Sequence, residues 1–315
     1  MMSVLAKLLG VHPSKGGTRR NLYVAAAGSA HGCRQIPCYG CLPDSCMSVI
    51  SLVISKACTA HASDSFLTEL KNGTHHIRES KQSKISRVPA FRGALAYWGL
   101  ALYAGPKWST HKWLDRRAAG ASQSADPEKF ASALAHDLGS ALAQLGVTGI
   151  TSGIGIHFTA YERVNGQRIP ELFLISNWTD TSYSAVTPGP LRVTRETFHA
   201  ISGKAPAQAH ALPAARMQVH AFLQAGNILT FNNGDPLLYG PAAAGIFTML
   251  QRIALRGQLS NTSSMRVWAS LARRPVEIVS KAQQDFCRLG QRLVGGKPHE
   301  LVIDSTGQYF SSTGD

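Results

Sequence analysis

The sequence predicts an α+β protein, and three observations carry this prediction. The first is the run 49–54, which is rich in β-branched residues and typical of a buried strand. The second is a pair of segments that alternate apolar and polar residues on either side of Asn165-Gly166. The third is a set of amphipathic segments, of which 126–145 and 275–293 are the clearest helices.

Local signals mark the ends of the central elements. A helix is expected to begin at Asp126-Pro127, because aspartate caps a helix and proline favours its first position, and to end before Gly146. The strands 153–161 and 169–177 flank Asn165-Gly166, which is a strong signal for a tight β-hairpin turn.

The C-terminal third is expected to hold further helices and a last strand. Apolar residues recur at helical spacing in 216–225 and 242–255. A helix over 275–293 would have Pro275 at its start. It is followed by the strand 299–303 and a polar turn, Asp304-Ser305-Thr306-Gly307.

Ser48 is the first candidate for chemistry. It follows Met47, and aminopeptidases remove a methionine that precedes a small residue. Removal would leave Ser48 with an α-amine and a hydroxyl on one residue. The ordinary pKa of an α-amine is about 8, so the neutral amine can accept a proton from the hydroxyl. Ser48 is therefore a candidate N-terminal nucleophile, and the plainer alternative is an ordinary serine in the first strand.

Three further residues follow Ser48 in a suggestive order. Asp64 lies 16 positions after Ser48, and Lys84 precedes a strand-turn-strand segment that closes at Gly99. This order resembles that of the proteasome β-subunit and of the peptidase subunit of the bacterial two-component protease. In those proteins a terminal Thr or Ser is followed by an aspartate, a strand-borne lysine and a closing glycine. Lys81 remains open as a substitute for Lys84.

The resemblance implies a fold and a reaction. The fold would be a four-layer αββα sandwich over residues 48–315, with two antiparallel sheets between helical layers, as in N-terminal nucleophile hydrolases. The reaction would be hydrolysis of peptide (amide) bonds through an acyl-enzyme on Ser48. Lys84 would polarise the nucleophile, Asp64 would orient the lysine, and the Gly99 N–H would bind the oxyanion. The resemblance also implies a peptide or protein substrate, a homo-oligomeric ring, and neither cofactor nor metal; an unfoldase partner stays open.

The chain also departs from that family. Gln291 and Val294 occupy places where the family has Asp and Ser that hold the N-terminal amine, and neither can act as an acid. An inactive scaffold subunit with the same fold is therefore the alternative function. The segment 179–274 is longer than the family pattern and rich in Pro, Ala, Gln and His, which predicts an inserted surface segment.

Residues 1–47 are predicted to form a disordered leader. The leader is either a propeptide that masks Ser48 or upstream sequence from a wrongly placed start codon. Its Cys38-x-x-Cys41 is half of a zinc motif with no second half, so we expect no metal site. Beyond the leader, two cysteines, Cys58 and Cys287, favour a reducing cytoplasmic setting.

The formal net charge of +14 favours a different class of function, nucleic-acid binding. The basic residues are spread along the chain, however, and no zinc-finger pair or RNA-binding strand signature occurs. The best basic patch is 107–117, so we rank this function below hydrolysis. The sequence contains no run of eighteen apolar residues, and we expect no membrane span.

Overall fold

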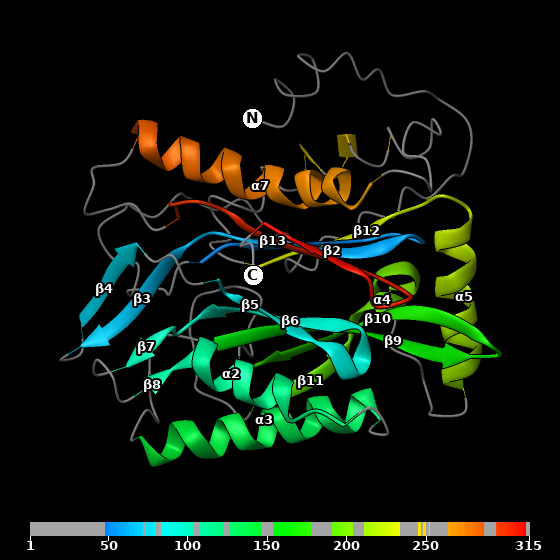
Figure 1. Cartoon of the computed structure of the whole chain (residues 1–315), viewed down its shortest axis with the longest axis horizontal. Helices are drawn as coiled ribbons and strands as arrows, with labels where there is room; N and C mark the ends of the chain where they lie inside the picture. Colours follow the sequence, from blue (N-terminus) through cyan, green and yellow to red (C-terminus); the bar gives the residue numbers. More distant parts are fainter. Residues whose placement is uncertain are drawn as a thin grey trace, which may run out of the picture.

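Two five-stranded antiparallel sheets stack face to face in the computed structural model (Figure 1). Helix α7 (Met265–Phe286) packs on the outer side of the first sheet, and α2 (Thr110–Ala119) and α3 (Pro127–Gln144) pack on the outer side of the second. The predicted α+β fold, a four-layer αββα sandwich, is thus confirmed. The structure describes residues 48–71, 74–79, 83–103, 108–122, 126–145, 154–177, 191–203, 211–233, 245–246, 248–249, 252, 264–286 and 294–312.

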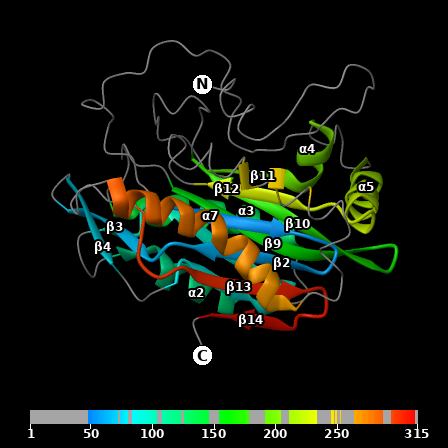
Figure 2. The same cartoon turned by 90° about the horizontal axis from the view of Figure 1, so that it is seen from above.

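The first sheet has the strand order β12-β1-β2-β13-β14, and every neighbouring pair is antiparallel. Figure 2 shows α7 lying over its strands β2 and β13. The strands are β1 (Ile50–Ile54), β2 (Cys58–Ser63), β12 (Leu229–Asn233), β13 (His299–Asp304) and β14 (Tyr309–Ser311).

The second sheet has the order β11-β10-β9-β6-β5 and is also antiparallel throughout. The predicted hairpin joins its two longest strands, and both turn residues, Asn165 and Gly166, have positive φ as a tight primed turn requires. A short 3-10 helix, η1 (Pro89–Phe91), connects β5 to β6. The strands are β5 (Ile85–Val88), β6 (Gly93–Gly99), β9 (Ile154–Val164), β10 (Gln167–Ser176) and β11 (Arg192–Arg195).

A smaller sheet lies beside the sandwich, with the order β4-β3-β7-β8. Its central pair, β3 and β7, is parallel and its other pairs are antiparallel. The strands are β3 (Phe66–Lys71), β4 (Thr74–Glu79), β7 (Leu102–Tyr103) and β8 (Trp108–Ser109). Because β3 begins directly after β2, this sheet starts next to the region that holds Asp64.

Burial on both faces explains the apolar run of β1. Val49 and Val53 face α7, whereas Ile50 faces the interior between the two sheets. Within the second sheet, β6 and β9 approach closely at Gly93. A Cβ on Gly93 would lie 1.7 Å from the Thr159 carbonyl oxygen, so this position in β6 tolerates no side chain.

Helix α7 differs from its prediction. A helix starting at Pro275 was expected, but the structure begins it at Met265 and places Pro275 inside. An internal proline removes one backbone hydrogen bond of the helix. The buried residues Trp268, Ala272, Val276 and Val279 continue one apolar face across it, so their packing on the first sheet offsets that loss.

The described parts of the segment 179–274 belong to the sandwich. They supply β11 to the second sheet and β12 to the first, together with α4 (Glu196–Ser202) and α5 (Leu212–Gln224). The helix predicted over 216–225 overlaps α5, which begins four residues earlier and ends at Gln224. The prediction over 242–255 lies mostly outside the described residues. The limits of the proposed insertion remain a prediction.

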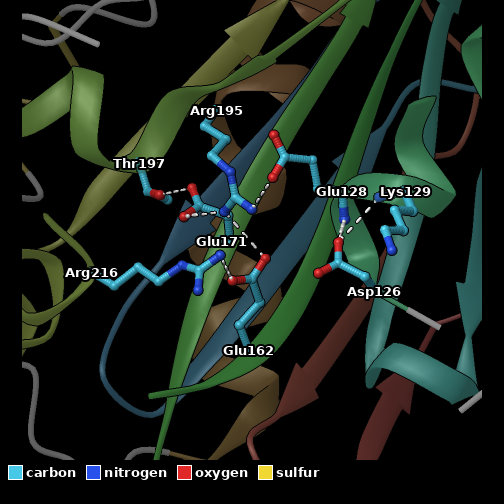
Figure 3. A network of polar contacts seen from close by, with 8 residues as sticks. All are labelled: Asp126, Glu128, Lys129, Glu162, Glu171, Arg195, Thr197 and Arg216. Atoms are coloured by element: carbon cyan, nitrogen blue, oxygen red, sulfur yellow. Dashed lines mark hydrogen bonds and ion pairs between the residues drawn. The ribbon is translucent and has the colours of Figure 1, made fainter. Parts of the chain in front are cut away.

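A buried network of charges anchors this segment (Figure 3). Arg195, on β11, contacts Glu128 of α3 at 2.8 Å, Glu162 of β9 at 3.2 Å and Glu171 of β10 at 3.3 Å. Burial raises the pKa of both Glu162 and Glu171, and the arginines oppose that rise. Arg216 of α5 also pairs with Glu162, so the network ties β11 and α5 to the β9–β10 hairpin.

Two buried histidines bridge the sheets. His61 of β2 bonds to the hydroxyl of Thr159 at 2.9 Å, and His157 of β9 bonds to the side-chain oxygen of Asn233 at 2.5 Å. Burial lowers the pKa of His61 to about 3 and that of His157 to about 4. Both imidazoles are therefore neutral in the folded protein at pH 5 and above.

We expect these histidines to make the protein sensitive to acid. Between pH 6.5 and the lowered values, the unfolded chain binds more protons than the folded protein, so the free energy of unfolding falls as the pH falls. Each histidine contributes a loss of about 2 kcal/mol between pH 7.5 and pH 5. Urea unfolding at pH 7.5 and at pH 5 measures this loss of unfolding free energy. His61→Gln should reduce the difference, whereas the exposed His136→Gln should not; equal pH dependence of wild type and His61→Gln would contradict the expectation.

Candidate active site

Ser48, Asp64 and Lys84 meet at one end of the sandwich, and we call them the Ser48 cluster. Ser48 lies just before β1, Asp64 directly after β2, and Lys84 directly before β5, so three strand ends bring the residues together. The Lys84 ammonium donates a hydrogen bond to the Ser48 hydroxyl at 2.9 Å and one to Asp64 Oδ1 at 2.7 Å. All three side chains are fully buried.

Antiparallel pairing places Asp64 against the start of β1. The Val49 N–H donates to Asp64 Oδ1 at 2.9 Å, and the Asp64 N–H donates to the Val49 carbonyl at 3.1 Å. The Phe66 N–H donates to the other carboxylate oxygen at 3.2 Å. The carboxyl group is thereby fixed in position from both sides, and it holds Lys84 toward Ser48.

The electrostatics of the cluster depend on the lysine. Burial raises the pKa of Asp64, whereas the charge and hydrogen bond of Lys84, and the N–H groups of Val49 and Phe66, lower it. Burial, and then the neighbouring Asp64, also raise the pKa of the Tyr97 hydroxyl. Asp64 can therefore stay ionised in this dry environment only through its partners. Chemically, the arrangement delivers a positive charge and a proton donor to a serine oxygen.

The Lys84 assignment rests on these contacts, because Lys81 lies outside the described residues. Backbone register explains the position of Lys84: the Tyr97 N–H donates to the Lys84 carbonyl at 3.2 Å, so Lys84 lies beside β6. Gly99 ends β6 two residues beyond Tyr97 and has a φ of 91°. Such a φ favours glycine, since side chains rarely tolerate it. The oxyanion role of Gly99 remains a prediction.

The sequence predicts that Gln291 and Val294 leave the Ser48 amine without an acid beside it, and the structure describes one of these two positions. Val294 is buried in the apolar cluster that also contains Val49, and its N–H donates to the side-chain oxygen of Gln283 at 2.7 Å. The next residue, Gly295, accepts a hydrogen bond from the Ser65 N–H at 3.1 Å. The backbone at Gly295-Gly296 therefore lies next to the Ser48 cluster, through its contact with Ser65, the residue after Asp64. Gln291 lies outside the described residues.

One neighbour was missed from the sequence. His299 begins β13 opposite Ser63, the residue before Asp64, and its buried Nε2 has no hydrogen-bond partner among the described residues. Burial lowers the pKa of His299, as do Lys297, Lys84 and His111. The period-two pattern of the strand, which puts His299 on the same face as Leu301 and Ile303, could have indicated this inward position.

The sequence also led to predictions about metal ions, cofactors and membrane spans. Within the described ranges, no three His, Cys, Asp or Glu side chains gather closely enough to hold a metal ion. The Cys38-x-x-Cys41 motif and the rest of the leader lie outside those ranges, and the absence of cofactors stays a prediction. No described helix is both long enough and apolar enough to cross a membrane.

The Ser48 cluster lies at the end of the four-layer sandwich where the first strand begins. No family model and no curated protein matches the sequence. Among solved structures, the chain is similar to Anbu (ancestral beta-subunit) from Yersinia bercovieri, with 14% identity, a TM-score of 0.42, and coverage of 85% of this chain and 88% of that one. It is also similar to an Anbu (Gly-1) mutant from Hyphomicrobium sp. strain MC1, with 10% identity, a TM-score of 0.43 and the same coverage.

These findings correct the family expected from the sequence. The assignment to the proteasome β-subunit-like family is wrong in its particulars, since the solved structures reported above are Anbu proteins, a distinct group. The physical reason is that Ser48, Asp64, Lys84 and Gly99 are a short set of residues at strand ends. Such a set reflects a fold and its local chemistry, and it does not distinguish one branch of that fold from another.

Proposed function

We propose that the chain is an amide hydrolase that uses Ser48 as an N-terminal nucleophile. The observation that supports this most is the pair of hydrogen bonds from the buried Lys84 ammonium to the Ser48 hydroxyl and to Asp64. A lysine in this position stabilises negative charge developing on the serine oxygen, and the aspartate keeps the lysine charged and oriented.

The proposed reaction begins with removal of residues 1–47, which frees the Ser48 amine. The neutral amine takes the hydroxyl proton as Ser48 Oγ attacks the carbonyl carbon of a peptide bond. The Gly99 N–H stabilises the resulting oxyanion. The amine then passes its proton to the leaving nitrogen, the C–N bond breaks, and an ester on Ser48 remains. Water, deprotonated by the same amine, hydrolyses the ester and restores the hydroxyl.

An inactive subunit of the same fold is the second candidate, and Val294 favours it. An N-terminal amine needs acceptors to hold it for attack, and this buried position carries an apolar side chain. The peptide substrate, the homo-oligomeric ring, the cytoplasmic location and any unfoldase partner belong to the active proposal and remain predictions.

The processed terminus separates the two candidates. We expect protein expressed in a bacterial cytoplasm, from Met1 and from Met47, to show an intact mass and an N-terminal sequence that begin at Ser48. Processing is expected because a serine side chain permits methionine removal, and a propeptide would be cut at the same bond. A chain that retains Met47 on both expressions would keep the Ser48 nitrogen in an amide, which would exclude the nucleophile mechanism and favour the inactive subunit.

A further inference from the structure

Three arginines converge on one turn at the end of the sandwich away from the Ser48 cluster. Arg168 and Arg92 both donate to the Ser305 carbonyl oxygen, at 2.9 Å and 3.2 Å, and Arg87 donates to the Gly307 carbonyl at 3.4 Å. They come from β10, from the residue after η1 and from β5. We call these three residues the arginine cluster. Two guanidinium groups that share one oxygen must lie close together, although their charges repel.

No acid balances this charge in the described part of the chain. None of the three arginines lies within ion-pair distance of a described carboxylate, whereas five other described arginines each contact at least one. The acid of the turn, Asp304, uses Oδ1 to accept the N–H groups of Thr306, Gly307 and Gln308 at 2.8 to 3.0 Å. The five arginines with acidic partners are Arg117, Arg195, Arg216, Arg273 and Arg274.

The side chains of the cluster are held in place. Arg87 stacks on the ring of Tyr309, 3.8 Å from its centroid, and all three arginines are half-buried. Arg92 has a φ of 53°, a left-handed backbone conformation that is costly for a residue with a side chain. Each guanidinium carries five N–H donors, and the bonds to the turn use one from each. Several oriented donors therefore remain beyond these bonds.

We infer that Arg87, Arg92 and Arg168 form a binding site for a phosphate-type oxyanion. Guanidinium groups match phosphate oxygens with two parallel N–H bonds, and a tetrahedral anion of two negative charges offers enough acceptors for three of them. A single carboxylate carries one charge and two oxygens, so it would leave most of the cluster unbalanced. The site lies at one end of β5 and β13, and Lys84 and His299 lie at the other end of these two strands. The inference does not depend on the proposed hydrolysis.

The test measures anion binding to the full chain. Isothermal titration and thermal unfolding are carried out with sodium phosphate, against sodium chloride at matched ionic strength. We expect phosphate to bind and to raise the unfolding midpoint beyond the chloride control. Arg168→Gln and Arg92→Gln should each weaken phosphate binding by at least about tenfold, because a charge-assisted hydrogen bond is lost. Arg192→Gln, an exposed arginine at the start of β11, removes the same charge and should bind like wild type.

A further variant controls for misfolding, and further ligands identify the source of the phosphate. Arg168→Lys keeps the charge and should fold, yet bind phosphate more weakly than wild type because it lacks the planar fork. A short oligodeoxynucleotide that binds with the same arginine dependence would assign the phosphate to a nucleic acid; binding of inorganic phosphate alone would assign it to a free anion. No phosphate effect beyond chloride, an equal loss in Arg192→Gln, or tighter binding of a glutamate-rich peptide than of phosphate would overturn the inference.

Discussion

The Ser48→Ala variant is expected to lose hydrolysis of a panel of fluorogenic peptide amides, by at least about a thousandfold, while its fold is unchanged. The substitution removes the attacking oxygen and leaves the Lys84–Asp64 pair at 2.7 Å in place. Initial rates with saturating substrate measure the loss, and circular dichroism with urea unfolding checks the fold.

The chain contains a matched control for this variant. Ser51, three residues further on and within β1, is also buried, and its hydroxyl has no hydrogen-bond partner in the described part of the chain. Ser51→Ala therefore makes the same chemical change outside the Ser48 cluster, and we expect its rates to equal those of wild type. Equal activity of Ser48→Ala and wild type would exclude Ser48 as the nucleophile, whatever the result at Ser51.

The Lys84→Met variant is expected to lose about 3–5 kcal/mol of unfolding free energy. Methionine matches the shape of lysine but leaves the carboxyl group of Asp64 buried without its charged partner, although the Val49 and Phe66 N–H groups remain. Urea unfolding at pH 7.5 measures the change. Pairing it with Asp64→Leu should recover part of the loss, because the uncompensated buried acid is then gone.

An exposed lysine provides the comparison. Lys281 contacts Asp285 at the same 2.7 Å, but the two side chains are 68% and 46% exposed. Lys281→Met should therefore change the unfolding free energy by less than about 1 kcal/mol, since solvent screens such a pair. A loss at Lys84→Met no greater than that at Lys281→Met would show that the buried pair does not hold this end of the sandwich together.

Most residues of the candidate site could be predicted from the sequence. Ser48, Asp64 and Lys84 were selected by residue type and order, and the structure brings these three together. The residues that contact one another are at most 36 positions apart in the sequence. Each of them lies next to the end of a strand with a clear apolar pattern. The choice between Lys84 and Lys81 could not be made in this way, because it depends on the register of β5 against β6.

Other features of the site could not be found by local patterns. His299 reaches the Ser48 cluster from a strand more than two hundred positions later in the chain, and only the pairing of β13 with β2 places it there. The arginine cluster gathers Arg87, Arg92 and Arg168 around a turn near residue 305. In the sequence these arginines are isolated basic residues, and the net charge of the chain gives no hint of their convergence.

By itself, the sequence determined the elements whose causes are local: the apolar strand β1, the hairpin at Asn165-Gly166, and the helix capped by Asp126, whose carboxylate accepts the Glu128 N–H at 2.8 Å. These depend on neighbouring residues alone. The tertiary structure decided what depends on distant contacts: the continuation of α7 through Pro275, the two histidine bridges between the sheets, and the burial that makes Asp64 depend on Lys84. The reason is that desolvation and packing arise only when segments far apart in the chain meet.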